Sequence, residues 1–301
     1  MNHPAELAIR AYLNNAVKGK GTISEDNLEQ IASDVKSALK RQFAGPPRED
    51  FRLRMSNLGR PTCQLWYDKN KPEVAEALPS NFLMNMVLGD LVEAVFKGLL
   101  REANVEFNDS QKVSLKLDDD TEITGECDLT IGNTVDDIKS ASPWSFKNKF
   151  ESYGALANED SFGYVSQLAG YAQALGVDVG GWWVINKGNG DFKYVSAQEM
   201  DIKEVNKKIK ATVDYIQNDE PFKRCYKAEP ETYRKVPSGN YVLPRGCTFC
   251  KYKKDCWETL QELPSKVSNA KEPPIVNYVS LLNINLMSRF VFKRQTEKSQ
   301  V

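Results

Sequence analysis

The triplet Asp137-Ile138-Lys139 combines two side chains that could work together on a phosphate group. The alternating pattern around it predicts a strand, and residues two apart on a strand point to the same face. Asp128 lies on the preceding predicted strand and is expected beside the pair. Two carboxylates can hold a divalent cation through oxygen ligands, while the ammonium orients water or stabilises developing negative charge. This combination is suited to phosphodiester hydrolysis.

An acid-x-Lys triplet also occurs elsewhere in the chain, so its spacing alone identifies no site. The other copies are Asp34-Val35-Lys36, Asp191-Phe192-Lys193 and Asp201-Ile202-Lys203. The context distinguishes the copy that contains Asp137. The dipeptide Gly132-Asn133 is a two-residue hairpin signal, and it joins the strand of Asp137 to the strand of Asp128.

Glu93 is the candidate for a third metal ligand. It lies on a helix predicted from about Phe82 to Leu100, among the apolar residues Leu91, Val92 and Val95. In that setting its carboxylate faces the edge of the sheet. The alternative is an ordinary surface glutamate, which is the commoner situation for this residue type.

Gln167 and Tyr171 are the candidate substrate-binding residues. They lie four residues apart on a helix predicted for 160–175, so they share one helix face, with Tyr164 above them. An amide beside a phenol can hydrogen-bond a phosphate or hold a nucleotide in register. A half-buried helix face with no binding role is the alternative interpretation.

The cysteines indicate a second metal site. Cys247, Cys250 and Cys256 form a compact group of three thiols, whereas zinc or a four-iron cluster normally takes four ligands. Cys63 and Cys225 are both available as the fourth. In a reducing compartment such a group is more typical of metal binding than of disulfides.

Composition sets the general class of protein. The chain has 301 residues, a formal net charge of −1 and 41% hydrophobic residues, as in soluble globular proteins. No apolar window is long enough for a signal peptide or a membrane span, so a cytoplasmic location without a membrane partner is expected. Local basic clusters permit DNA binding without requiring it. Cys127 lies on the apolar face of its predicted strand and is expected in the core. The only histidine in the sequence is His3.

The predicted elements describe an α/β core with a mixed β-sheet. Helices fill most of the first forty residues, and the second helical region ends at the breaker Ala44-Gly45-Pro46-Pro47. The remaining elements are strands over 113–117, 123–131, 135–140, 182–185 and 192–195 and helices over 82–100, 160–175 and 202–216. We expect an N-terminal helical segment at 1–50, a core at 51–260 and a C-terminal tail or helix at 261–301.

These motifs, in this order, resemble the PD-(D/E)XK nuclease superfamily, in particular its RecB-like branch with an iron–sulfur cluster. That branch includes AddB-type recombination nucleases and CRISPR-associated exonucleases. The resemblance extends from about Ser56 to Trp257 and implies a restriction-endonuclease-like core with a central mixed sheet flanked by helices and a cysteine-cluster C-terminal lobe. The branch usually has a histidine where this chain has Glu93, a difference that predicts an all-oxygen metal site.

The resemblance also implies roles for individual residues. Asp128, Asp137 and the backbone carbonyl of Ile138, with Glu93, would hold Mg²⁺ or Mn²⁺, and Lys139 would act in catalysis. Gln167 and Tyr171 match the family's Gln-x-x-x-Tyr motif. The cluster ligands would be Cys63, Cys247, Cys250 and Cys256. The resemblance thus favours Cys63 over Cys225 as the fourth ligand, and a [4Fe–4S] cluster over Zn²⁺. Such a cluster would brace the chain around the site.

The function that the resemblance implies is a metal-dependent DNA exonuclease that hydrolyses phosphodiester bonds at DNA ends, on single strands, in recombination, repair or phage DNA metabolism. Two alternatives remain open. One is a nuclease-like DNA-binding module that does not cut, and the other is a zinc-stapled protein without nuclease activity. The segment after Pro264 is a candidate contact for a protein partner.

Overall fold

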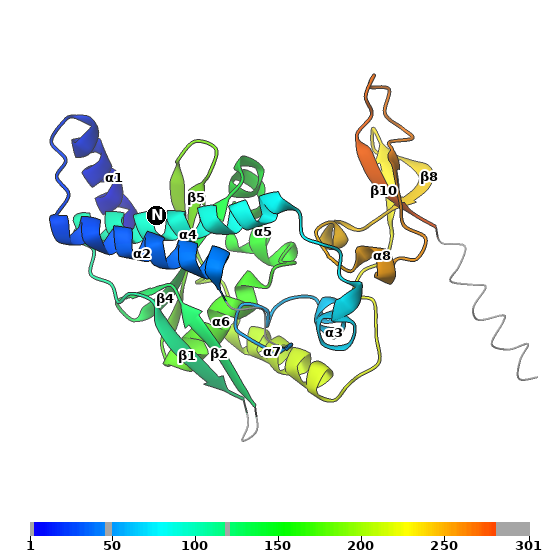
Figure 1. Ribbon diagram of the computed structural model, residues 1–301, viewed down its shortest axis with the longest axis horizontal. Coiled ribbons are helices and arrows are strands. Elements are labelled where there is room, and N and C mark those ends of the chain that lie inside the picture. The colour runs from blue at the N-terminus through cyan, green and yellow to red at the C-terminus, as the bar shows by residue number, and fades with distance from the viewer. Residues whose placement is uncertain (1–2, 46–49, 118–120, 281–301) are drawn as a thin grey trace, which may run out of the picture. The chain divides into compact units, whose positions relative to one another are not determined.

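The computed structural model describes residues 3–45, 50–117 and 121–280 (Figure 1). The chain divides into two compact units, Met1–Pro61 with Leu78–Glu220 and Thr62–Ala77 with Pro221–Val301. This division differs from the expected boundaries at 1–50, 51–260 and 261–301. The N-terminal helices belong to the same unit as the core, because their apolar faces pack on it, and the cysteine-rich segment forms part of the second unit.

The central sheet of the first unit has four strands in the order β3-β4-β5-β6. Its strands are β3 (Leu129–Ile131), β4 (Thr134–Ala141), β5 (Asp178–Asn186) and β6 (Phe192–Ser196). The outer pairs are antiparallel and the central pair β4–β5 is parallel, so the sheet is mixed as expected. The β3–β4 hairpin turns at Gly132, whose φ of +59° is one that glycine adopts readily.

The strand expected over 123–131 is divided into two at Asp128. Its first part, β2 (Glu122–Cys127), pairs with β1 (Gln111–Lys116) in a separate two-stranded sheet, and its second part is β3. Asp128 lies between them and its side chain accepts a hydrogen bond from the backbone of β4. The break allows the chain to pass from one sheet to the other.

Helices cover both faces of the central sheet. On one face lie α1 (Pro4–Val17) and α4 (Ser80–Glu102), with α2 (Glu25–Ala44) packed against α4 (Figure 1). On the other face lies α6 (Tyr164–Leu175), with α7 (Ile202–Gln217) packed against it. Two short helical segments, the π-helical η2 (Ser145–Lys149) and α5 (Tyr153–Asn158), connect β4 to α6. The first unit is therefore an α/β structure with helices on both sides of a mixed sheet.

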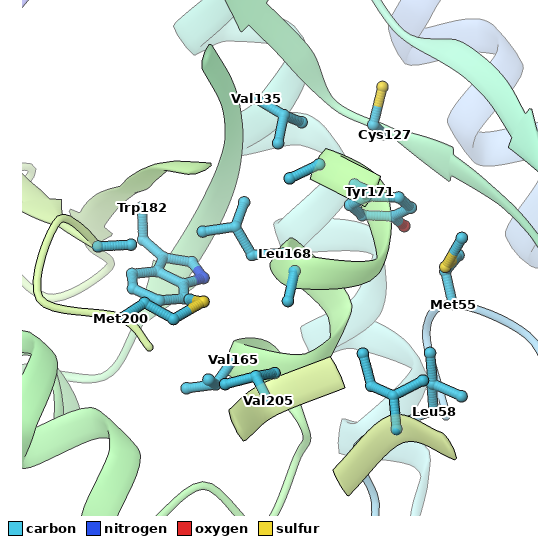
Figure 2. Close-up of a cluster of buried hydrophobic side chains, with 14 of the residues drawn as sticks. Met55, Leu58, Cys127, Val135, Val165, Leu168, Tyr171, Trp182, Met200 and Val205 are labelled. Carbon is cyan, nitrogen blue, oxygen red and sulfur yellow. The ribbon is translucent and has the colours of Figure 1, made fainter. Parts of the chain in front are cut away.

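A buried hydrophobic cluster fixes α6 to the sheet. Val135 of β4, Trp182 of β5 and Leu168 of α6 belong to it, together with Tyr171 and Cys127 (Figure 2). Cys127 is fully buried, as expected for a core residue, and its thiol donates to the carbonyl of Gln111. This packing determines which face of α6 is turned towards β4.

The start of α6 depends on a close contact between two glycines. Gly163 has a φ of +81°, and a Cβ atom there would lie 2.5 Å from the carbonyl carbon of Gly59. We expect Gly163→Ala to lower the free energy of unfolding by roughly 2 kcal/mol or more, because backbone strain and a clash add together. Urea unfolding measures this. Gly176→Ala, at the other end of α6, is the matched control, because Gly176 has a φ of +67° with open space around it. Equal losses of unfolding free energy in the two variants would show that the contact between Gly163 and Gly59 does not contribute to stability.

The second unit contains α3 (Thr62–Asn70), η1 (Pro72–Val74), η3 (Arg245–Cys247), α8 (Lys253–Cys256) and an antiparallel sheet in the order β7-β8-β10-β9. The strands are β7 (Glu229–Tyr233), β8 (Val236–Val242), β9 (Gln261–Pro264) and β10 (Ile275–Val279). Residues 261–280 were expected to be a tail or a helix, yet they contribute two strands, because the backbone of β10 pairs with both β8 and β9. The rest of that segment, 281–301, lies outside the described residues. No helix in the described part of the chain is long and apolar enough to cross a membrane.

Candidate active site and thiol cluster

Strand β4 presents Asp137 and Lys139 on one face, as their spacing predicts. The Lys139 ammonium lies 2.5 Å from Oδ2 of Asp137. Asp137 is only 1% exposed, and neither of its oxygens accepts a hydrogen bond of normal geometry from the described residues. The preceding residue, Asp136, points to the opposite face, where it accepts a hydrogen bond of 2.8 Å from the Tyr194 hydroxyl. Of these two adjacent aspartates, Asp137 is therefore the one that lies buried on the same face as Lys139.

Asp128 joins this pair from the break between β2 and β3. Its Oδ2 accepts a hydrogen bond of 2.7 Å from the backbone N–H of Ile138, the residue between Asp137 and Lys139. The expected proximity of the two aspartates is therefore present. The Ile138 side chain lies in the hydrophobic cluster on the opposite face of the sheet.

Glu93 reaches the same region from α4. Its Oε1 lies 2.8 Å from the ammonium of Lys97, one turn later on the helix. Burial, reinforced by the nearby Asp128 carboxylate, raises the pKa of Glu93 to about 7, although Lys97 opposes this shift. Glu93 is therefore a half-buried residue near Asp128 rather than an isolated surface glutamate, and its role as a metal ligand stays a prediction.

The carboxylates influence one another's protonation. Burial, followed by the charge of Asp137, raises the pKa of Asp128 to about 6. Burial also raises the pKa of Asp137, with Lys139 acting against it. Burial would lower the pKa of Lys139, but Asp137 and Asp128 outweigh it and the net shift is upward. These groups form a crowded acidic site in which the ammonium groups of Lys139 and Lys97 provide compensating charge.

Helix α6 contributes the predicted substrate-binding residues. The Gln167 amide donates a hydrogen bond of 3.1 Å to the Tyr171 hydroxyl, so the two share a face as expected. Burial raises the pKa of Tyr171, so its phenol stays protonated. The Tyr164 ring lies 5.2 Å from the Lys139 ammonium, which connects the start of α6 to β4.

A cleft of about 1480 Å³ in the first unit reaches part of this site, but Asp137 and Lys139 are not among the residues that line it. Its walls come from α2, α4, the β1–β2 hairpin and α6, together with the segment that contains Arg52 and Arg54. Glu93, Asp128 and Gln167 all line it. Sequence reasoning missed the contribution of α2, because the helix is remote in sequence and its polar residues have the pattern of a solvated face.

No ready-made metal site is present: within 3–45, 50–117 and 121–280, no three His, Cys, Asp or Glu side chains lie together in a metal-holding arrangement. The donor set nevertheless fits a hard divalent cation by its chemistry. Glu93, Asp128 and Asp137 are close enough to influence one another's pKa, and both oxygens of Asp137 are buried without a normal hydrogen bond. A cation would have to draw these side chains away from their present partners Lys139, Lys97 and the backbone of Ile138.

In the second unit, four cysteines line one small cavity. They are the four that the sequence analysis favoured, Cys63, Cys247, Cys250 and Cys256. Cys225 is not among the residues that line the cavity. Its exposed thiol accepts a hydrogen bond of 3.1 Å from the backbone N–H of Cys63. Cys63 therefore lines the cavity with the three C-terminal thiols, while Cys225 adjoins Cys63 and also acts to raise the pKa of Cys247 and Cys256.

Aromatic and polar contacts fasten α3 to the segment that carries the other thiols. The rings of Tyr67 and Tyr252 stack with centroids 4.9 Å apart. The Tyr67 hydroxyl donates to Asp255 at 2.8 Å, and the Tyr252 hydroxyl donates to Asp68 at 2.6 Å. These contacts hold α3, the helix that carries Cys63, against the segment with the other thiols. Burial raises the pKa of Cys247 to about 12 and also raises that of Cys256, so metal binding there must displace protons.

Comparisons with known proteins identify no family for this chain. No protein-family model matches it, and no curated protein has a matching sequence. Among solved structures, the chain is similar to the crystal structure of SSO0001, at 12% sequence identity and a TM-score of 0.42. That match covers 76% of this chain and 95% of the other. A TM-score of this size carries no argument about fold or function, so the functional conclusion depends on the site itself.

Proposed function

We propose that the protein is a Mg²⁺- or Mn²⁺-dependent deoxyribonuclease with a restriction-endonuclease-like core. The observation that carries the proposal is the contact of 2.5 Å between Asp137 and Lys139, with Asp128 hydrogen-bonded to the backbone of Ile138 between them and Glu93 nearby. Three carboxylates and the Lys139 ammonium, from α4, β4 and the break between β2 and β3, are groups suited to metal-dependent phosphodiester hydrolysis. The mixed sheet with helices on both faces is consistent with such a core.

Each residue has a distinct role in this proposal. Glu93, Asp128 and Asp137 would hold the cation, with the backbone carbonyl of Ile138 as a further ligand. A bound Mg²⁺ or Mn²⁺ would polarise the phosphate and lower the pKa of a coordinated water. Lys139 would stabilise the negative charge that develops on the phosphate. The buried position of Asp137 keeps bulk water from competing for its oxygens.

Gln167 and Tyr171 would position the DNA. Their hydrogen bond holds the amide and the phenol together on the cleft side of α6, where they can reach a phosphate or a base edge. The basic side chains Arg52, Arg54 and Lys112 also line the cleft and would contact the DNA backbone. We propose that a single strand with a free end occupies this cleft and that the enzyme acts as an exonuclease.

We also propose that the four thiols of the second unit bind a [4Fe–4S] cluster. All four line one cavity, although the described residues include no ready-made arrangement for a metal ion. The choice of an iron–sulfur cluster over zinc follows the spacing of the cysteines and the family resemblance of the sequence. Iron and acid-labile sulfide in anaerobically purified protein would support the cluster. Zinc alone, in equal amount to protein, would contradict it.

One assay tests the nuclease proposal directly. Single- and double-stranded DNA labelled at either the 5′ or the 3′ end is incubated with Mg²⁺, Mn²⁺ or EDTA. We expect metal-dependent release of short labelled products from one end of the single-stranded substrate. Binding without cleavage under every metal condition would favour the alternative, a nuclease-like DNA-binding module. Release of internal fragments would contradict the exonuclease assignment while leaving nuclease activity in place.

A further inference from the structure

Lys97 is a buried lysine that directly contacts a proposed metal ligand. It lies on α4, one turn after Glu93, and is only 3% exposed. Its ammonium lies 2.8 Å from Oε1 of Glu93, 3.0 Å from Oδ1 of Asp109 and 2.5 Å from the Ser110 hydroxyl. All three hydrogens of the ammonium therefore have acceptors. A buried charge with this many partners holds those partners in fixed positions.

The contacts of Lys97 continue to a second proposed ligand. The Ser110 hydroxyl, which accepts from Lys97, also donates a hydrogen bond of 3.3 Å to the backbone carbonyl of Asp128. Asp109 is held from its other side by an ion pair with Arg101. Lys97 therefore links Glu93 on α4 to the chain break that carries Asp128, by way of the segment just before β1.

An exposed lysine–aspartate ion pair in the same unit contrasts with the buried contacts of Lys97. On α7, Lys210 and Asp214 have the same four-residue separation, but their closest atoms are 3.5 Å apart and both side chains are exposed. Such a pair contributes little to a fold. The side chain of Lys97 is 4% exposed and that of Lys210 is 60% exposed. Burying an ammonium is costly, so the contacts of Lys97 require a reason beyond helix stabilisation.

We propose that Lys97 is a positioning residue that sets the distance between Glu93 and Asp128 for metal binding. The inference rests on the proposed function, because it assumes that both carboxylates hold the cation. Lys97 acts through Glu93 and Ser110 and does not touch the substrate. Charge repulsion has the opposite effect, because a nearby positive charge repels a cation and its removal would tighten metal binding. The sign of the change in metal affinity therefore decides between positioning and simple repulsion.

The test measures Mn²⁺ binding to the full chain by electron paramagnetic resonance, without DNA. Methionine has nearly the length of lysine but no charge, so Lys97→Met removes the linkage and keeps most of the packing. We expect the Kd for Mn²⁺ to rise about 10-fold or more, as is usual when a group that orients a metal ligand is lost. Lys97→Arg keeps the positive charge, so its Kd for Mn²⁺ should lie between those of the wild-type protein and Lys97→Met. An unchanged or tighter Kd in Lys97→Met would overturn the proposal.

Two further variants keep the test decisive. Lys210→Met removes the exposed pair on α7 and should leave Mn²⁺ binding unchanged. Ser110→Ala removes the link to Asp128 but keeps the Glu93–Lys97 pair, so it should also weaken binding, and it decides the question if Lys97→Met fails to fold. Asp137→Asn checks the metal site itself. If wild-type protein binds no Mn²⁺, or if Asp137→Asn leaves binding intact, the proposed function fails and the role of Lys97 with it.

Discussion

Lys139→Met is expected to reduce metal-dependent DNA hydrolysis by about 1,000-fold, which corresponds to about 4 kcal/mol of transition-state stabilisation. The ammonium lies 2.5 Å from Asp137 and is the positive group that the structure brings closest to that carboxylate. Methionine preserves the length of the side chain and removes its charge. The measurement is the initial rate of product release from end-labelled DNA in Mg²⁺. DNA affinity, measured by fluorescence anisotropy, should change little, because Lys139 acts on the transition state.

A second acid-x-Lys strand in the same sheet provides the control. Lys193 of β6 follows Asp191 by two residues, as Lys139 follows Asp137, but its ammonium donates to the carbonyl of Phe146 and lies over that ring. Lys193→Met should retain activity close to that of the wild-type protein. Full activity in Lys139→Met, or equal losses in the two variants, would show that the catalytic assignment is wrong.

The second large effect is expected from the thiol cluster. Cys256→Ser should lose most of the bound iron and sulfide, because it removes one of the four thiols that line the cavity. Folding and metal binding are coupled in such sites, so the second unit should also become less stable. Cys247 and Cys256 belong to the small apolar cluster of the second unit, together with Tyr252 and Trp257. Iron analysis and thermal unfolding of anaerobically purified protein measure the two effects.

Cys225→Ser is the matched control for this prediction. The Cys225 thiol accepts a hydrogen bond from the backbone of Cys63 but does not line the cavity. Cys225→Ser should therefore keep its iron, and Cys63→Ser should lose it. The reverse result would identify Cys225 as the fourth ligand. Retention of iron in Cys256→Ser would argue against the cluster itself.

The parts of the fold that depend on local pattern could be predicted from the sequence. The hairpin at Gly132 follows from its turn signal, and the shared face of Asp137 and Lys139 follows from the period of a strand. The four-residue spacing of Gln167 and Tyr171 likewise predicts that they share one helix face, where their side chains hydrogen-bond each other. These features need only a few neighbouring residues, so local propensity is sufficient to fix them.

Features that depend on distant partners could not be predicted. The break at Asp128 is invisible in an alternating pattern, because it depends on a hydrogen bond with the backbone of β4. Strands β9 and β10 were missed for a similar reason: they are short, and their pairing partners decide their structure. Lys97 resembles any helix-surface lysine until Asp109 and Ser110 are brought against it. The available signal was its four-residue separation from Glu93.

The interruption of the second unit in sequence has a consequence for the order of synthesis. Residues 62–77 leave the ribosome before the rest of the first unit, but their partners follow only after Pro221. Cys63 and Cys256 are about 190 residues apart, which at 5–20 residues per second is a delay of roughly 10–40 s. The first unit can begin to fold during that interval. Cys256 is the last of the four cavity thiols to be synthesised. Insertion of the cluster would then mark a chain translated at least as far as Cys256, and shorter fragments would lack it.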